Sequence, residues 1–295
     1  MRSSENSLCL ISICSYCMDQ FSVWPSPCKG FWLSLVFMIG MLAGTQGVFA
    51  HDTWVEANTG VVRAGDAVFV DLKLGNHGND HRDFKLASKV DLAGCKLQIL
   101  LPNGAKYDML DQLRDLGYAP NEGYWSGKFV CGAAGTHLVA HQYDQVVHHG
   151  RPIRSIKSGK CFFLSTTQLD RVKDDSELWK TPIGHPLEIV PLSHPVLFTG
   201  PGMPVRVQVL RNGKPLADAR VSFIPQGVTL AEGFDDTYER RTDENGQAAF
   251  TPKTGAKLLI VTHLRAEEEK SKDYDLTAYS ATLHMIIPEI CPCCQ

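Results

Sequence analysis

Alternating apolar and polar residues predict β-strands along most of the chain after residue 50. The alternation is clearest over residues 68–74, where valine and leucine at the even positions alternate with Phe69, Asp71 and Lys73. A period of two residues is typical of a strand with one buried face. Turn residues such as Asn212-Gly213 separate comparable segments. Further strands are predicted over residues 95–101, 124–130, 136–143, 205–210, 219–224, 247–250 and 257–263.

This spacing of short strands and turns predicts an all-β protein made of two consecutive antiparallel β-sandwich modules, immunoglobulin-like or transthyretin-like. We expect the first sandwich over residues 51–190 and the second over residues 191–288, followed by a cysteine-rich tail at 289–295. The only segments with helical character are short and lie at residues 107–116 and 174–179.

The first 50 residues have the pattern of an export signal. Lys29 precedes an apolar run at residues 31–43, which is too short to span a bilayer comfortably. Val48 and Ala50 occupy the positions that a signal peptidase reads, so cleavage is expected between Ala50 and His51. Residues 1–50 are therefore predicted to be a signal peptide, and the protein to be periplasmic or otherwise exported. The alternative is an uncleaved anchor that tethers the domain to a membrane.

Charge and motif content exclude several function classes. The chain has 29 Lys and Arg residues against 32 Asp and Glu residues, a formal net charge of -3. No large basic surface is available for a phosphate backbone, so nucleic acid is not an expected partner. The sequence also lacks a Gly-x-Ser-x-Gly elbow, a His-Glu-x-x-His helix, a phosphate loop and a dinucleotide fingerprint. Nothing specific therefore indicates an enzyme.

Six of the ten cysteines follow the predicted cleavage site. Cys95 and Cys131 both lie in predicted strands, which favours a disulfide between sheets in an oxidising compartment, and Cys161 has no obvious partner. The tail motif at residues 291–294 (CPCC) suits soft or borderline ions such as Cu(I) and Zn(II). Its alternative, favoured outside the cytoplasm, is oxidation to a disulfide.

Several motifs, taken in order, carry a family resemblance. They are the segments 51–56 (HDTWVE), 63–66 (RAGD), 186–191 (PLEIVP), 213–217 (GKPLA) and 242–246 (TDENG). From His51 to about His284 the chain resembles exported proteins described as periplasmic components of cobalt and nickel uptake systems. The resemblance implies a transition-metal ligand and a membrane transporter as partner. The second module is similar to transthyretin-like and carboxypeptidase-regulatory modules, whose usual role is structural or adhesive.

His51 is the first candidate metal ligand. As a mature N-terminus it would offer its α-amine and its imidazole Nδ1 to one ion, and a second imidazole would complete a histidine brace suited to Cu(II) or Ni(II). Together with the resemblance, this predicts a Cu, Ni or Co ion, whose identity the sequence leaves open. The alternative is an exposed terminal histidine with no role.

Four other histidines are candidate partners for His51. His77 and His81 lie on a glycine-rich segment dense in oxygen and nitrogen donors, which is either a ligand loop or a set of solvated turns. His137 and His141 share one face of a predicted strand but lie roughly 13 Å apart at ~3.3 Å per residue, so either one could meet His51 but not both as a pair. The remaining isolated histidines are expected to be structural: His185, His194, His263 and His284.

These observations predict an exported protein that binds a transition-metal ion, as an accessory or carrier for metal uptake or homeostasis. Two alternatives stay open. One is a copper oxidoreductase that uses the N-terminal His51, and the other is a structural envelope or adhesion protein built from transthyretin-like modules.

Overall fold

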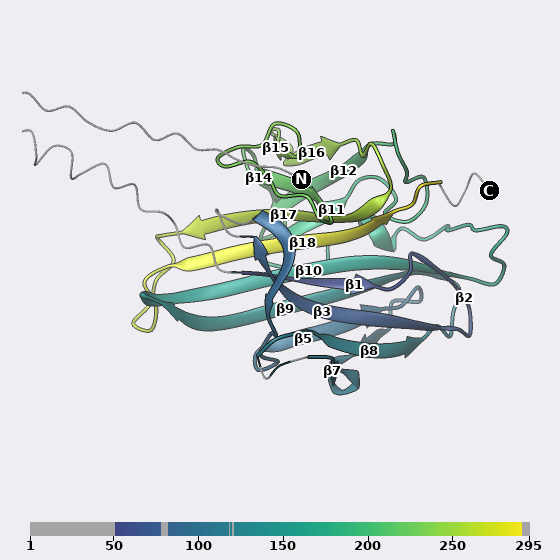
Figure 1. The fold of residues 1–295 in the computed structure, drawn as a ribbon, viewed down its shortest axis with the longest axis horizontal. Helices are drawn as coiled ribbons and strands as arrows, with labels where there is room; N and C mark the ends of the chain where they lie inside the picture. The colour runs from purple at the N-terminus through teal and green to yellow at the C-terminus, as the bar shows by residue number, and fades with distance from the viewer. Residues whose placement is uncertain (1–50, 78–81, 118, 120, 291–295) are drawn as a thin grey trace, which may run out of the picture. The chain divides into compact units, whose positions relative to one another are not determined.

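The computed structural model describes residues 51–77, 82–117, 119 and 121–290 (Figure 1). About half of these residues are in β-strands, almost none are helical, and the strands form largely antiparallel sheets, so the predicted all-β sandwich class is confirmed. Among the residues described, no helix is long and apolar enough to cross a membrane.

The two predicted helices are wrong. Residues 107–116 form parts of strands β6 (Lys106–Asp108) and β7 (Arg114–Asp115) around the three-residue 3₁₀ turn η1 (Leu110–Gln112). The second segment contains only η2 (Leu178–Lys180). Asp174, the first residue of that segment, accepts hydrogen bonds from Thr136 and His194 of the surrounding sandwich. Tertiary contacts therefore override the local helical tendency.

The first sheet has five strands. Its order is β1-β3-β8-β7, and β4 pairs with β3. Three of these strands coincide closely with sequence predictions or motifs, namely β1 (Asp52–Ala57), β3 (Ala67–His77) and β8 (Trp125–Val130), and the others are β4 (Arg82–Ser88) and β7. The β1–β3 pairing is antiparallel and places Asp52 opposite Gly75.

The central sheet has nine strands, in the order β15-β14-β17-β18-β10-β9-β5-β6, with β2 paired to β10. Its longest members are neighbours, β9 (Gly135–His149) and β10 (Arg151–Thr166). The others are β2 (Val61–Arg63), β5 (Cys95–Leu100), β6, β14 (Arg220–Pro225), β15 (Glu239–Arg241), β17 (Ala256–Ala266) and β18 (Thr277–Ile287).

The central sheet joins the two halves of the chain. Residues 154–161 of β10 pair in parallel with residues 277–284 of β18, and the other main-path pairings of this sheet are antiparallel. A third sheet contains β11 (Leu187–Pro191), β12 (Val205–Arg211), β13 (Lys214–Pro215) and β16 (Gln247–Phe250). The boundary predicted near residue 190 falls at the end of β11, while strands from both sides of that boundary share one hydrogen-bonded sheet.

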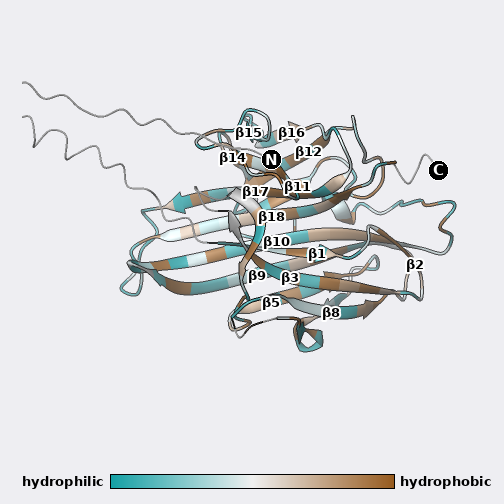
Figure 2. Cartoon of the chain, in the orientation of Figure 1, coloured by the Kyte–Doolittle hydropathy of each residue, from teal (hydrophilic) through white to brown (hydrophobic). Residues whose placement is uncertain are grey.

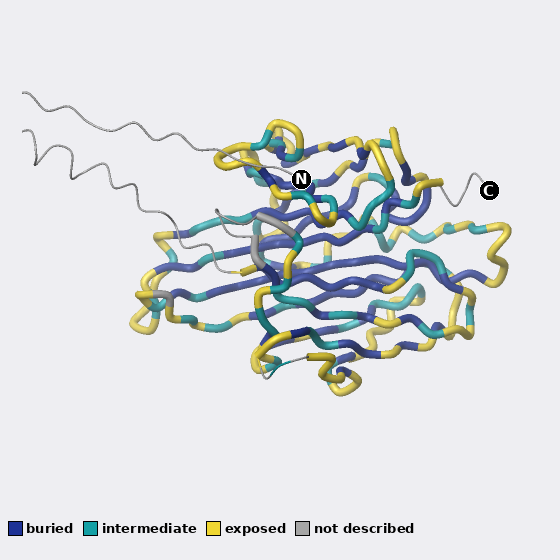
Figure 3. Tube along the Cα trace, viewed as in Figure 1, coloured by how far each residue is buried: buried dark blue, intermediate teal, exposed yellow. Residues whose placement is uncertain are grey.

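Both faces of the central sheet are buried. On β9, Leu138 and Ala140 pack in one apolar core with the third sheet, while Val139 packs in another core with the first sheet. The alternation follows from the opposite directions of successive side chains in a strand. Figure 2 shows apolar segments along the paired strands, and Figure 3 shows the inner strands buried and the connecting loops exposed. The three sheets therefore form layers around two large apolar cores, and a smaller third cluster contains Trp54.

Strand β1 is buried on both sides, with all six residues inaccessible. Val55 and Ala57 join the core between the first and central sheets, whereas Trp54 packs with Leu259 and Val261 of β17. Residues 52–57, close to the start of the predicted mature chain, are thus buried. Their polar side chains therefore need hydrogen-bond or ion-pair partners inside the fold.

Candidate metal site

The strand register brings two of the candidate histidines to one end of the β1–β3 pair. His51 immediately precedes β1 and is exposed, and His77 is the last residue of β3. Since Asp52 lies opposite Gly75 in an antiparallel pairing, His51 and His77 both lie just beyond that paired position. His81 lies outside the described residues.

Asp52 connects this end of β1 to the second half of the chain. Its carboxylate is fully buried, and both oxygens lie 2.9 Å from Nε2 of His263 on β17. A carboxylate only accepts, so Nε2 carries the hydrogen and donates it. The His263 side chain is 28% exposed, so this pair sits at the border between the interior and solvent.

The sequence analysis missed His263 as a candidate. It was expected to be structural because no other ligand type stands near it in the sequence, and its partner Asp52 lies 211 residues away. A carboxylate that holds one ring nitrogen of a histidine is a common arrangement beside metal ligands, since it fixes the tautomer and the ring direction. In the sequence, His263 follows the continuous apolar run at residues 258–261, which fits a structural position equally well.

The sheet beneath Asp52 is polar. Ser280 on β18 lies opposite both His263 on β17 and Lys157 on β10, so the three share one face of the central sheet. Burial lowers the pKa of Lys157, although the nearby charge of Asp52 opposes that shift. The hydroxyl of Ser280 is buried and makes no hydrogen bond to any residue that the structure describes.

Glu56, at the other end of β1, is the centre of a buried ion cluster. Lys73 and Lys257 both contact its carboxylate, the latter at 3.1 Å, and Nε2 of His284 lies 3.3 Å away. Burial favours the neutral acid, but the charges of His284, Lys73 and Lys257 outweigh it and lower the pKa of Glu56 to about 2. Burial also lowers the pKa of His284 to about 4, so at neutral pH the two lysines supply the compensating charge.

His141 is buried and both of its ring nitrogens are engaged. Nδ1 lies 3.2 Å from the carbonyl oxygen of Lys96, which can only accept, so Nε2 accepts from the Thr53 hydroxyl at 3.1 Å. Burial lowers the pKa of His141 to about 3. This ring therefore contacts β1 two residues from His51, but as a neutral hydrogen-bonding group.

His137 packs in an aromatic core. Its ring stacks on Phe163 at 4.7 Å between centroids and meets Phe129 edge-on, and Nδ1 donates to the carbonyl of Gly135. Burial lowers its pKa, and Nε2 has no hydrogen-bond partner among the described residues. Among the side chains that the structure describes, which do not include that of His77, no three from His, Cys, Asp or Glu are grouped so that they could hold one metal ion.

The predicted disulfide between Cys95 and Cys131 is wrong. Both are free thiols, as is Cys161, and all three are buried in the core between the first and central sheets. Burial raises the pKa of Cys95 to about 12 and that of Cys131 to about 11. Cys95 lies in a strand, as predicted. However, placing two cysteines in two facing sheets does not by itself bring their thiols within bonding distance. The tail motif at 291–294 lies outside the described residues.

Two other isolated histidines are buried in the second half of the sequence. His194 Nδ1 accepts from the backbone N–H groups of Val196 and Leu197, which leaves Nε2 to donate to Asp174 at 3.1 Å. His185 lies beside the ion pair of Lys160 and Glu188, and burial lowers its pKa to about 4. Its Nδ1 makes no hydrogen bond to any residue that the structure describes.

Two solved structures have a distant likeness to this chain. A DUF4785 family protein from Legionella pneumophila shares 13% identity, with a TM-score of 0.27 over 70% of this chain and 51% of that one. The adhesin InvE of Yersinia pseudotuberculosis shares 12% identity, with a TM-score of 0.21 over 78% of this chain and 58% of that one. The chain thus spans about half the length of the first of these proteins.

Comparison with sequences gives a family. A search of curated proteins finds no significant match. The family model described as a domain of unknown function, DUF4198, matches residues 48–265, a range that begins just before His51 and ends within β17 just after His263. Both ends of the Asp52–His263 contact lie within that range, and by this match the chain belongs to the DUF4198 family.

Proposed function

We propose that this chain is an exported protein that binds a transition-metal ion, Cu(II), Ni(II) or Co(II), at the end of the β1–β3 strand pair. The observation that carries the proposal is the register of that pair, which places His51 and His77 at the same strand end beside the Asp52–His263 contact. His51, His77 and His263 would be the ligands, and Asp52 would orient the ring of His263.

The donor set fits such an ion. Imidazole nitrogens suit Cu(II) and Ni(II), and geometry rather than raw affinity decides which ion is held. Cleavage before His51 would add the α-amine as a further nitrogen ligand. The exposed position of His51 gives an ion direct access from solvent, which suits a carrier that takes up and releases its cargo. A role in metal uptake or homeostasis, with a membrane transporter as partner, follows from this proposal and from the sequence resemblance.

Calorimetric titration with Cu(II) and Ni(II) tests the proposal. The protein beginning at His51 is compared with the same protein carrying one extra glycine before His51, which turns the basic amine into an amide. We expect the extension and the His77→Gln and His263→Gln substitutions each to weaken binding by roughly ten-fold or more. His148→Gln is the matched control, since His148 is exposed but lies on β9 away from this strand end. Equal affinities for all five proteins, with unchanged thermal unfolding, would refute the site.

A further inference from the structure

A separate pocket lies in the second half of the chain, between β16 of the third sheet and β17 of the central sheet. Its volume is about 460 Å³, within the range of small-molecule sites. The floor is apolar and belongs to the main core, with Phe250, Leu258 and Ile287 among its residues. The rim is polar and carries Arg240, Lys253 and Asp236. An apolar floor under a charged rim suits a ligand with one apolar end and one charged end.

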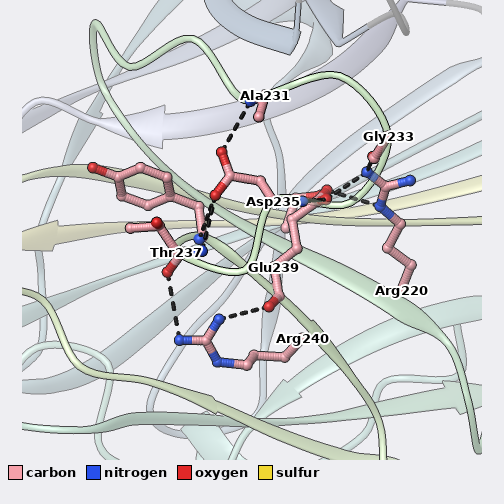
Figure 4. Close-up of polar contacts among 9 residues, drawn as sticks. Arg220, Ala231, Gly233, Asp235, Thr237, Glu239 and Arg240 are labelled. Carbon is pink, nitrogen blue, oxygen red and sulfur yellow. Dashed lines mark hydrogen bonds and ion pairs between the residues drawn. The ribbon is translucent and has the colours of Figure 1, made fainter.

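The walls of this pocket are held rigidly by two carboxylates. Asp235 accepts hydrogen bonds from the backbone N–H groups of Ala231, Thr237 and Tyr238 (Figure 4). Glu239 is buried and accepts from the guanidinium of Arg220 and from the backbone N–H of Asp235. The loop that carries Thr237 and Tyr238 is therefore fixed before any ligand arrives, which lowers the entropic cost of binding.

Arg240 is anchored at the rim without losing its charge. Its Nη1 donates to the backbone carbonyls of Asp236 and Glu239 at 2.7 and 2.6 Å, and Nη2 lies 3.4 Å from the carbonyl of Thr237 (Figure 4). Carbonyl oxygens are neutral acceptors, so they position the guanidinium but leave its charge uncompensated. Within the described segments, neither Arg240 nor Lys253 forms an ion pair.

The net positive charge of the rim favours a negatively charged ligand. Two cations, Arg240 and Lys253, stand against one carboxylate, Asp236, so the rim has a formal excess of one positive charge. A guanidinium with fixed direction is well suited to a carboxylate, which can accept two of its N–H groups. Inorganic phosphate would satisfy the cations but leave the apolar floor uncovered.

We propose that this pocket binds a small organic monocarboxylate with an aromatic or branched aliphatic body. The body covers Phe250 and Leu258, and the carboxylate lies against Arg240 and Lys253. This site is distinct from the proposed metal site and does not depend on it, since its lining includes none of His51, Asp52, His77 and His263.

Titration with matched probes tests the inference on the full mature chain. Phenylacetate is compared with phenylacetamide, which has the same ring but no charge, and with inorganic phosphate. We expect measurable binding of phenylacetate, roughly ten-fold weaker binding of phenylacetamide, as the loss of one charge-assisted hydrogen bond predicts, and no binding of phosphate. Equal binding of the two ring compounds, binding of phosphate alone, or no binding of phenylacetate would each overturn the proposal.

Substitutions locate the bound carboxylate. Arg240→Gln is expected to weaken phenylacetate binding roughly ten-fold, and Lys253→Gln, at an exposed position, to weaken it by a smaller factor without affecting the fold. Arg241→Gln is the matched control, because Arg241 is the next residue, is exposed and pairs with Asp218 instead. Thermal unfolding identifies any loss of structure in Arg240→Gln. Unchanged affinity in both Arg240→Gln and Lys253→Gln would refute the assigned rim.

Discussion

Asp52 and His263 are joined by a contact in which one imidazole nitrogen lies 2.9 Å from both oxygens of a fully buried carboxylate. The contact ties the first strand of the described chain to β17, 211 residues later. It lies at the same end of β1 as His51, so it connects the stability of the fold to the geometry of the proposed metal site. Substitutions in this pair are therefore informative about both.

Asp52→Ala is expected to lower the free energy of unfolding by about 1.5–3 kcal/mol. The change removes the buried carboxylate that accepts the His263 N–H. It also removes the negative charge that lies near the buried Lys157. Urea unfolding of the metal-free protein measures the effect. Asp66→Ala is the control, because Asp66 forms an ion pair with Arg63 at the surface, and such pairs contribute little. A loss no larger than that of the control would contradict the prediction.

Glu56→Gln is expected to reduce stability in a pH-dependent way. The folded pKa of Glu56, about 2, lies below its ordinary value of 4.5, so the ionised carboxylate stabilises the fold above about pH 4.5 and that contribution disappears as the pH falls toward 2. The loss on substitution should be about 3 kcal/mol at pH 7 and less than half of that at pH 3. Urea titrations at both pH values measure it, and an equal loss at both would be the contrary result.

His141→Gln is expected to flatten the acid side of the stability profile. The folded pKa of His141 is about 3 and its ordinary value is 6.5, so between these values the unfolded chain binds a proton that the folded chain does not. That difference destabilises the wild-type fold by about 2–3 kcal/mol as the pH falls from 6.5 to 4.5. Glutamine cannot take up the proton, so the variant should lose less stability than the wild type as the pH falls from 6.5 to 4.5. Urea unfolding of both proteins at pH 6.5 and pH 4.5 measures the difference, and equal losses of stability in the two proteins would contradict the prediction.

The three core thiols are expected to resist alkylation until the protein unfolds. Cys95, Cys131 and Cys161 are buried, and their raised pKa values keep them protonated and poorly nucleophilic. Iodoacetamide treatment with and without urea, followed by peptide mapping, should find these residues modified only in urea. A peptide mass that links Cys95 to Cys131 would show instead that the disulfide predicted from the sequence forms.

Local sequence patterns predicted eight of the eighteen strands that the structure describes. Residues 68–74 lie within β3, and residues 205–210 within β12, because the alternation of apolar and polar side chains is itself the cause of a half-buried strand. The same reasoning missed β10 and β18, whose burial on both faces removes the alternation. It also assigned helices at residues 107–116 and 174–179, where sheet pairing and the contacts of Asp174 prevail.

For the candidate site, the sequence by itself determined only which residue types were available: a histidine at the start of the predicted mature chain and others on a glycine-rich segment. Only the tertiary structure decided that His77 ends the strand beside His51, that His141 is a neutral buried group, and that His263 is the partner of Asp52. The physical reason is that strand register and sheet order join residues hundreds of positions apart. No local pattern encodes those long-range pairings, whereas the burial of alternate side chains appears in the local sequence of each half-buried strand.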